Sequence, residues 1–438
     1  MTQALPSTAK PDRKFRVRAA EGGPVDLMSQ VRDQGAQLSW VFGGKLGLIG
    51  ANAAVMLFLA GRLELRTYGL LVLTISGQLL ISRLLILGTD AGMVRLTALD
   101  DLKSRSPEIV TAGMILIARS STVLLFVWLL LTPVLSAFDI PAWVLASIVT
   151  GAIGTALVDY GYSFRLARQE YPLGAVAQGG TAIWRVGLTV LAAIKFPTSP
   201  AVIFFAYHGA SLLSGLAQTI LILRTRRRPD RALIQRLLRY SWWLGKANVV
   251  VIFSLYQGTL LLMLLKQPAA TGLFGLGLTL SLAFFALYNA YSEYLTVRIR
   301  SVDDSSHIRG FLARSLAAAV ALMVASAPVI FIVAMLIPWF LGPAWLDVVP
   351  VFVYLSASMV LLILQAPLVA ACHYFLKPHL IMFGWLMRAV FIGLAGIVLA
   401  PRWEAVGAAM GQLIGSALAL LALSWFVAGS LRSSEKAN

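Results

Sequence analysis

Twelve long apolar segments occupy most of the 438 residues and leave only short connections between them. Most of these segments are long enough to cross about 30 Å of hydrocarbon as a helix. Only 13% of the residues are charged, whereas soluble proteins keep roughly a quarter. The sequence does not show the short alternating segments of a membrane β-barrel. It therefore predicts an all-α, polytopic membrane helical bundle of about 12 spans, at residues 37–60, 67–90, 110–134, 141–164, 172–195, 199–223, 241–265, 270–294, 315–338, 347–372, 378–400 and 404–428.

Basic residues are concentrated in alternate connections. If the N-terminus is cytoplasmic, the inside segments hold 25 Lys and Arg and the outside segments hold five. The positive-inside rule describes this distribution, so we expect both termini in the cytoplasm, with polar tails at residues 1–36 and 429–438. Residues 1–36 contain no apolar stretch like that of a cleaved signal peptide. The first span is therefore expected to serve as an uncleaved insertion signal.

The formal net charge of +17 raises nucleic acid as a partner. Seven arginines, however, lie in the connection at residues 224–240, where a cytoplasmic loop would contact anionic lipid. We therefore expect membrane lipids as partners and no nucleic acid. A single cysteine, Cys372, excludes an internal disulfide. The sequence contains no phosphate-binding Gly-rich loop and no His/Glu metal motif, so neither enzymatic activity nor a cofactor or metal is expected.

The chain also resembles itself at an offset of about 202 residues. Five matches occur in the same order, with offsets from 201 to 206, so chance is a poor explanation. Six spans in each half keep both halves in one orientation. We therefore expect two parallel six-helix lobes around a central cavity, at residues 37–223 and 241–428. Transporters built in this way bind cargo between the lobes and expose it alternately to each side by rocking them. The clearest matches are Ser39-Trp40 with Ser241-Trp242, Gly44-Lys45 with Gly245-Lys246, Pro141-Ala142-Trp143 with Pro343-Ala344-Trp345, and Arg185 with Arg388.

Six basic side chains lie inside the predicted spans. A charge at the bilayer centre costs at least about 2.5–3.5 kcal/mol, so these side chains must face protein or a wet cavity. Asp159 is the only acidic residue well inside a span, because Asp90 and Glu293 lie near span ends. The excess positive charge indicates an anionic cargo. The six basic residues are Lys45, Arg83, Arg119, Arg185, Lys246 and Arg388.

These residues have different expected roles. Arg185 and Arg388 occupy equivalent repeat positions near mid-membrane, so we expect them to face each other across the cavity and bind the cargo. Arg119 lies equally deep and is also expected in the cavity. Lys45, Arg83 and Lys246 lie near the cytoplasmic end, where they either attract the anionic cargo or extend to lipid headgroups. Residues 178, 181, 185 and 189 share one polar helical face, which predicts a cavity wall.

Two acidic residues are candidates for ion coupling. Asp159 would carry a coupling proton or pair with a neighbouring arginine, and Glu293 is the second candidate. His208 lies on a polar stripe with Ser211 and is expected to be a hydrogen-bonded histidine at a helix interface.

Four short motifs resemble those of polysaccharide flippases. These are Thr67–Leu71, Leu87–Arg95, Leu341–Trp345 and Ala405–Ala409. In them the chain is similar to the O-antigen and exopolysaccharide (Wzx-type) exporters of the multidrug/oligosaccharidyl-lipid/polysaccharide (MOP) superfamily. The resemblance implies transfer of an undecaprenyl-diphosphate-linked oligosaccharide to the periplasmic leaflet of a bacterial inner membrane, without ATP. It also implies that a polysaccharide polymerase and chain-length machinery act as partners.

Other functions remain open on the sequence. A multidrug exporter of the same superfamily would carry organic cations and would be expected to have acidic cavity residues. A major-facilitator transporter usually carries a Gly-x-x-x-Asp-Arg motif after its second span, and Met93–Ser106 lacks it. Polysaccharide polymerases and ligases usually have a large periplasmic loop, which this chain lacks. A membrane scaffold would leave the buried basic residues without a purpose.

Overall fold

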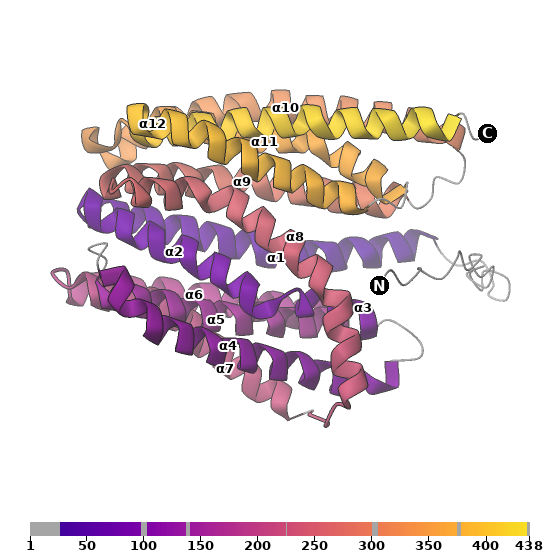
Figure 1. Cartoon of the computed structure of the whole chain (residues 1–438), viewed down its shortest axis with the longest axis horizontal. Coiled ribbons are helices and arrows are strands. Elements are labelled where there is room, and N and C mark those ends of the chain that lie inside the picture. Colours follow the sequence, from indigo (N-terminus) through magenta and orange to yellow (C-terminus); the bar gives the residue numbers. More distant parts are fainter. Residues whose placement is uncertain are drawn as a thin grey trace.

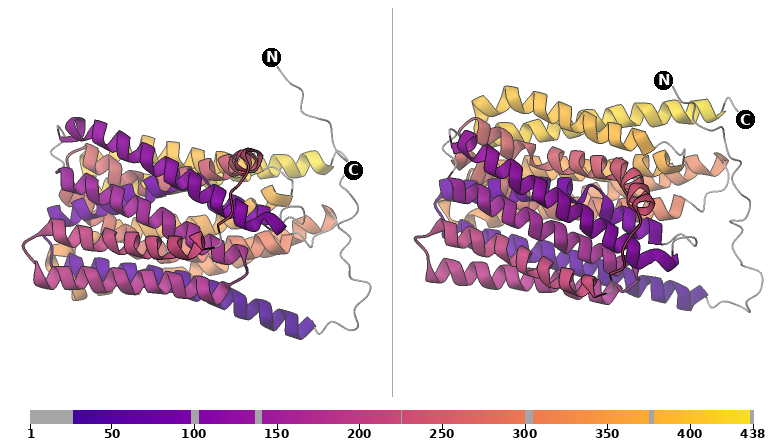
Figure 2. Two further views of the ribbon diagram at one scale, coloured as in Figure 1. Left: turned by 90° about the horizontal axis from the view of Figure 1, so that it is seen from below. Right: turned by 60° about the horizontal axis from the view of Figure 1, so that its bottom comes forward.

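A computed structural model describes residues 27–97, 103–136, 141–224, 226–299, 305–374 and 378–435. The regular structure in these ranges is entirely helical. The long helices run side by side along one axis, with connections at either end, as two further views show (Figure 2). The helices are α1 Leu27–Ala60, α2 Leu65–Ile86, α3 Thr89–Thr97, α4 Ser106–Ser136, α5 Ala142–Ala167, α6 Tyr171–Lys195, α7 Pro200–Leu223, α8 Arg231–Leu264, α9 Pro268–Arg298, α10 Ser305–Leu341, α11 Val348–Tyr374 and α12 Pro378–Glu435, with short 3₁₀ turns at Lys103–Arg105 and Pro343–Trp345.

Helix α12 crosses the bundle twice. Its helical dihedral angles break at Trp403 and Glu404, and the ribbon folds back on itself there (Figure 1). The two halves pack closely, since a Cβ atom on Gly411 would lie 2.9 Å from the backbone nitrogen of Gly396. With α3 too short to cross, the described residues make twelve passes. This number confirms the predicted all-α bundle of 12 spans.

Nine described helices are both long and apolar enough to span a membrane. The 58-residue α12 counts once in that number although it contains two passes. Helix α6 is not among the nine because a row of buried polar side chains lies along it, including Gln178, Thr181 and Arg185. The predicted cavity wall therefore lies on a helix that is less apolar than an ordinary membrane span.

Several helices extend beyond their predicted spans. Residues 231–240, which we predicted to be part of a connecting loop, form the first turns of α8. The Asp230 carboxylate caps this helix, because its Oδ1 accepts a hydrogen bond from the backbone N–H of Leu233 at 2.6 Å. Helix α1 begins at the same end of the bundle at which α12 finishes, as an even number of passes requires (Figure 1).

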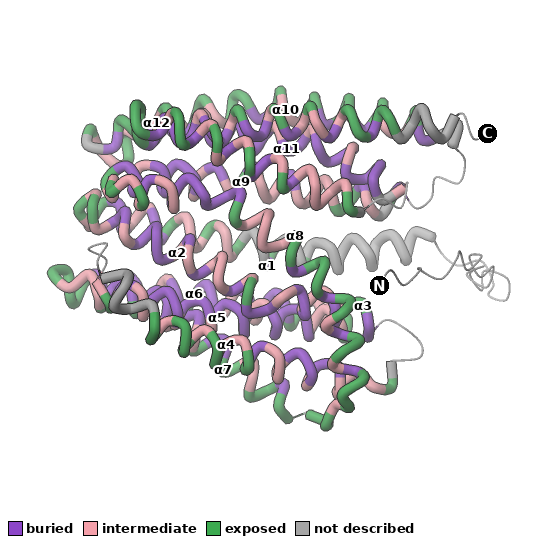
Figure 3. Tube along the Cα trace, viewed as in Figure 1, coloured by how far each residue is buried: buried purple, intermediate pink, exposed green. Residues whose placement is uncertain are grey.

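The helices form two parallel lobes of six passes each. In the first lobe α5 packs against α2 and α7, and α6 packs against α1 and α7. In the second, α11 packs against α9, α10 and α12, while α8 packs against α12. Apolar side chains on the outer faces of α4 and α10, such as Phe126 and Trp339, are exposed and suit hydrocarbon. The buried residues concentrate between the helices (Figure 3).

Helix α2 joins the lobes at both of its ends. At its start, a Cβ atom on Gly69 would lie 1.8 Å from the carbonyl oxygen of Pro268, so only glycine permits this contact with α9. At its end, Gly88 has a φ of 74° and packs against Gly245 of α8. These two glycines belong to the predicted motifs Thr67–Leu71 and Leu87–Arg95. Both motifs therefore have a packing role at the lobe interface.

Candidate functional site

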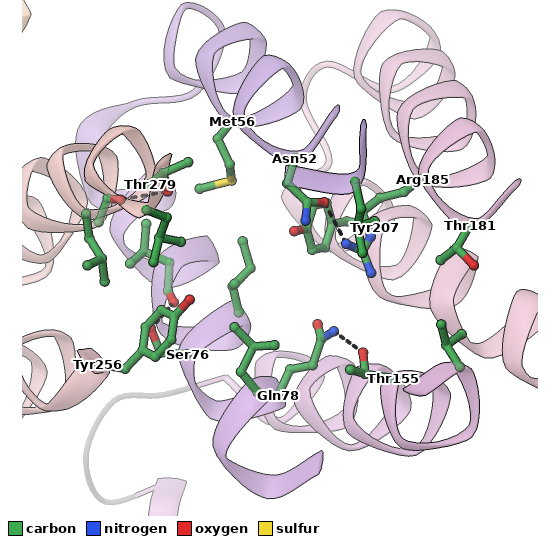
Figure 4. A pocket seen from close by; sticks show the side chains of 18 of the residues that line it. Asn52, Met56, Ser76, Gln78, Thr155, Thr181, Arg185, Tyr207, Tyr256 and Thr279 are labelled. Atoms are coloured by element: carbon green, nitrogen blue, oxygen red, sulfur yellow. Dashed lines mark hydrogen bonds between the residues drawn. The ribbon is translucent and has the colours of Figure 1, made fainter. Parts of the chain in front are cut away.

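A cavity of about 220 Å³ lies beside the interface between the lobes. Most of its wall comes from helices α1, α2, α5, α6 and α7 of the first lobe. The second lobe closes it with Tyr256 of α8 and residues of α9, including Thr279. Figure 4 shows the polar side chains that point into it. Those lining residues that carry polar or charged groups are Asn52, Ser76, Gln78, Arg83, Thr155, Asp159, Thr181, Arg185, Tyr207, Tyr256 and Thr279.

Arg185 is the main cationic group of this cavity and is only 7% exposed. Its Nη1 donates to Asn52 Oδ1 at 2.6 Å and its Nη2 donates to Ser211 Oγ at 2.6 Å. The guanidinium carbon lies 5.0 Å from the centre of the Tyr207 ring. These contacts tie α1, α6 and α7 together.

The hydrogen-bond capacity of Arg185 is only partly used. A guanidinium has five N–H donors, and two of them have the partners just described. Its buried Nε has no partner. Among the residues that the structure describes, no carboxylate lies within ion-pair distance of Arg185. The cavity therefore holds a fixed cation with donors still available to an oxyanion.

Arg83 has a different environment in the same cavity. Its Nη2 lies 3.0 Å from Asp159 Oδ2, and its Nη1 lies 3.7 Å from Asp90 Oδ2. Asp159 is the one carboxylate among the described lining residues, and it is thus paired with Arg83. Pairing with a neighbouring arginine was one of the two roles predicted for Asp159. The pair leaves Arg185 as the excess charge of the cavity.

His208 supports the cavity wall from behind. It is fully buried, with Nδ1 bonded to Gln78 Oε1 and Nε2 lying 2.8 Å from Thr74 Oγ1. The side-chain amide of Gln78 in turn donates to the hydroxyl of Thr155, so His208 orients two lining residues. The prediction of a hydrogen-bonded histidine at a helix interface is confirmed. This network requires glycine at position 151, because a Cβ atom there would lie 2.5 Å from His208 Nδ1 and clash with it.

Arg388 repeats the arrangement of Arg185 in the second lobe. Its Nη1 donates to Ser254 Oγ at 2.7 Å and its Nε donates to Ser416 Oγ at 2.9 Å. The pairs Asn52/Ser254, Arg185/Arg388 and Ser211/Ser416 are separated by 202, 203 and 205 residues, within the range of the sequence repeat. We call each arginine together with its two hydrogen-bond partners an arginine clasp. Each arginine thus bonds to residues on the first and the last pass of its own lobe.

The two arginines do not face each other across an open cavity, and that expectation was wrong. Arg388 is 0% exposed and does not line the cavity that contains Arg185. Each guanidinium group lies within its own lobe, because its hydrogen-bond partners are on helices of the same lobe. The structure brings together Arg185, Arg83 and Asp159 and leaves Arg388 apart.

The remaining predicted residues lie elsewhere. Arg119 is exposed on α4, Glu293 is exposed on α9, and neither lines the cavity. Lys246 is exposed on α8, with its Nζ 4.6 Å from the Trp242 ring. Lys45 lies on α1, but its side chain is outside the described residues. Ion coupling by Glu293 stays a prediction.

Sequence reasoning missed several lining residues. Ser211 was placed on a polar stripe with His208, but neither Ser211 nor Asn52 was predicted as a hydrogen-bond partner of Arg185. Gln78, Thr155 and Tyr256 were missed, since a single glutamine, threonine or tyrosine in an apolar span has many uses. The polar face of residues 178, 181, 185 and 189 was the useful signal, and all four side chains are buried together.

No protein-family model matches the chain, and no curated protein matches it. Solved structures do match it. A Vibrio cholerae MATE transporter, VcmN, is 15% identical with a TM-score of 0.56, covering 93% of this chain and 98% of that one. An inward-facing multidrug resistance MATE family transporter of the MOP superfamily is 12% identical with a TM-score of 0.63, covering 87% of this chain and 95% of that one.

A third structure is a MOP superfamily transporter from Pyrococcus furiosus, described as having a binding pocket of reverse polarity that suggests a different function. It is 12% identical with a TM-score of 0.54, covering 91% of this chain and 96% of that one. All three are transporters rather than enzymes, and none is described as a polysaccharide flippase. At these identities the likeness concerns architecture. The chain thus has the two-lobed, twelve-span fold of MATE transporters of the MOP superfamily.

Proposed function

We propose that this protein is a membrane transporter whose cavity binds the anionic head group of an amphiphilic cargo. One observation carries the proposal, namely the unpaired guanidinium of Arg185 inside the inter-lobe cavity. Its Nε is buried without a partner, and the nearby carboxylate of Asp159 is already paired with Arg83. A phosphate oxygen would complete the hydrogen bonding of Arg185 and neutralise its charge.

The fold supports transport by rocking of two lobes. Helix α2 contacts the second lobe at Gly69 and again at Gly88, with the cavity beside the length of helix between them. Separation of the lobes at one end of α2 would open the cavity to that side, while the other contact keeps the opposite side closed. The cargo would bind Arg185 in either state, because the Arg185 clasp lies wholly within the first lobe.

The finer proposal is a polyprenyl-diphosphate-linked oligosaccharide as cargo, carried from the cytoplasmic to the periplasmic leaflet. A diphosphate offers several oxygens to the planar fork of Arg185. The cavity of about 220 Å³ is sized for a head group rather than for a whole oligosaccharide. The sugar would therefore occupy space that opens when the lobes separate. This specific cargo rests on the resemblance of the short motifs and on the cavity charge.

A multidrug exporter is the second candidate, because one of the similar structures is described as a multidrug resistance MATE family transporter. An exporter of organic cations needs a free carboxylate in its cavity, and Asp159 is paired with Arg83. The Pyrococcus furiosus structure is described as a case in which pocket polarity suggests a different function on this fold. The polarity of the present cavity favours an anion over an organic cation.

A transport assay with two probes of opposite charge tests the proposal. The purified protein would be reconstituted in liposomes with either a fluorescent isoprenoid diphosphate or the organic cation ethidium. We expect translocation of the diphosphate and none of ethidium above protein-free liposomes. Ethidium transport that survives in Arg185→Ala, with no movement of the diphosphate, would establish the multidrug function instead.

A cellular assay tests the finer proposal. In a strain that lacks this gene, the wild-type protein should restore export of a surface polysaccharide, and Arg185→Ala at equal protein level should not. If deletion of the gene leaves surface polysaccharide unchanged, that cargo is excluded. The result of the liposome assay with the diphosphate and ethidium would still stand.

A further inference from the structure

A second concave site lies where the two lobes meet, along a line of contact that we call the lobe seam. It is separate from the cavity at Arg185. It is an apolar groove of about 300 Å³ between α2 of the first lobe and helices α8 and α12 of the second. Among the described residues that line it, Lys246 is the only charged one. The groove is lined by Leu84, Leu87, Trp242, Gly245, Lys246, Val249, Val250, Met382 and Leu386.

The polarity of α8 changes in a fixed order along this groove. Arg239, Trp243 and Lys246 follow one another on one face of the helix, and all three are exposed. Lys246 Nζ lies 4.6 Å from the Trp242 ring and 4.9 Å from the Trp243 ring. Beyond Lys246 the same face continues with Val249 and Val250 into the groove. Basic and aromatic groups thus precede the apolar groups along this face, as the head group and interface of a phospholipid precede its chains.

Lys246 has no anionic partner in the part of the chain that the structure describes. Among the described residues, no carboxylate lies within ion-pair distance of its ammonium group. Its exposed position beside two tryptophans at the bilayer interface suits a phosphate group of a lipid. The exposed apolar walls, Leu84 at 47% and Leu386 at 42%, suit a hydrocarbon chain.

We infer that this groove binds an anionic membrane phospholipid, whose phosphate pairs with Lys246 and whose acyl chain lies between Leu84 and Leu386. The inference does not rest on the cargo proposed for Arg185. The groove borders the contact between Gly88 and Gly245, at which α2 meets the second lobe. A lipid in the groove touches both lobes and therefore stabilises the arrangement in which this end of the seam is closed.

Lipid binding to the purified full-length protein tests this site. Native mass spectrometry would compare phosphatidylglycerol with phosphatidylcholine of identical chains. We expect wild-type protein to retain phosphatidylglycerol preferentially, by about fivefold for one basic group at the membrane surface. Lys246→Gln should remove this preference. The matched control Lys195→Gln, an exposed lysine at the opposite end of the bundle, should keep it.

Two further variants test the groove itself. Leu84→Trp fills it from the first lobe and Leu386→Trp from the second, and both positions are exposed enough to accept a larger side chain. Each should reduce retention of both lipids at this site. We also expect phosphatidylglycerol to raise the melting temperature of the wild type, and each tryptophan variant should lose that rise. Equal phosphatidylglycerol retention by the wild type, Lys246→Gln and both tryptophan variants would overturn the site and leave only non-specific lipid binding.

Discussion

The two arginine clasps share their chemistry but not their surroundings. In the first lobe Arg185 binds Asn52 and Ser211, and in the second Arg388 binds Ser254 and Ser416. Arg185 lines a cavity, whereas Arg388 is sealed inside its lobe with no exposed surface. One arrangement, repeated by the internal duplication, thus serves two purposes. A buried arginine therefore joins three membrane passes in each lobe, but only Arg185 also lines the cavity proposed to bind cargo.

The largest expected effect concerns transport. Arg185→Ala should reduce transport of an isoprenoid diphosphate by about tenfold to a hundredfold, because hydrogen bonds to a charged group contribute about 1.5–3 kcal/mol. Arg185→Lys should fall between wild type and alanine, since it keeps the charge and loses the planar fork. Arg388→Met should remain within about threefold of wild type. Initial rates in proteoliposomes at equal protein content measure all three variants. Equal losses for Arg185→Ala and Arg388→Met would contradict the claim that only Arg185 binds cargo.

Stability should show the reverse order. Arg388→Ala leaves a cavity and two serines with fewer partners inside the second lobe, so we expect a loss of about 3–5 kcal/mol in the free energy of unfolding. Arg185→Ala opens onto a polar cavity that water can enter, and it should lose only about 1–2 kcal/mol. Arg388→Met fills its volume and should come within about 1 kcal/mol of wild type. Unfolding in detergent with a denaturant series compares the three, and a greater loss for Arg185→Ala would contradict the assignment.

A smaller effect on cargo affinity is expected from Asp159, the carboxylate that lines the cavity of Arg185. Asp159→Asn releases Arg83, which should raise the affinity for an isoprenoid diphosphate by about threefold to tenfold. Asp90→Asn is the matched control, because Asp90 lies 3.7 Å from Arg83 and Asp159 lies 3.0 Å from it. The control should change the affinity by less. A weaker affinity in Asp159→Asn would mean that this carboxylate itself supports cargo binding.

The smallest effect lies outside the membrane, in a polar link between the lobes. Asp230, before α8, caps the N–H of Leu233 and pairs with Arg105 at 2.7 Å. The Leu233 hydrogen bond, followed by the Arg105 guanidinium, lowers the pKa of Asp230, and the bond to Glu108 raises the pKa of Arg105. The stabilisation is present above the unfolded pKa of about 3.9 and is lost as the pH falls through the lower folded pKa.

Asp230→Asn should therefore lower the melting temperature by only about 1–2 °C at pH 7, because both groups are solvated. The difference should shrink as the pH falls below the unfolded pKa of about 3.9. Differential scanning fluorimetry across this pH range provides the measurement. A difference that grows as the pH falls would contradict the direction of the pKa shift.

Much of the fold could be predicted from the sequence, because a membrane leaves few options for an apolar segment. The break at Trp403 and Glu404 falls at the boundary of the predicted spans 378–400 and 404–428. Helix ends were less predictable. The polar residues 231–240 continue α8 beyond the hydrocarbon, where the hydropathy pattern no longer distinguishes a helix from a loop.

The candidate site could be predicted only in part. Helical periodicity placed Arg185 on a polar face with Gln178 and Thr181, and that face is buried. Periodicity does not show which neighbouring helix supplies a partner or where space remains between lobes. For this reason Arg388 was predicted in the cavity and instead lies inside its lobe. The Arg83–Asp159 pair became visible only once α2 and α5 were placed together.

Equilibrium binding tests most directly whether Arg185 binds the anionic head group, since it separates cargo recognition from the rocking of the lobes. Isothermal titration calorimetry would measure farnesyl diphosphate binding to purified wild-type protein, Arg185→Met and Arg388→Met, which are equal chemical changes in the two clasps. We expect the affinity for farnesyl diphosphate to be at least about tenfold weaker in Arg185→Met and nearly unchanged in Arg388→Met. Unchanged binding in Arg185→Met, or an equal loss in both variants, would contradict the claim that the first lobe alone holds the anionic head group.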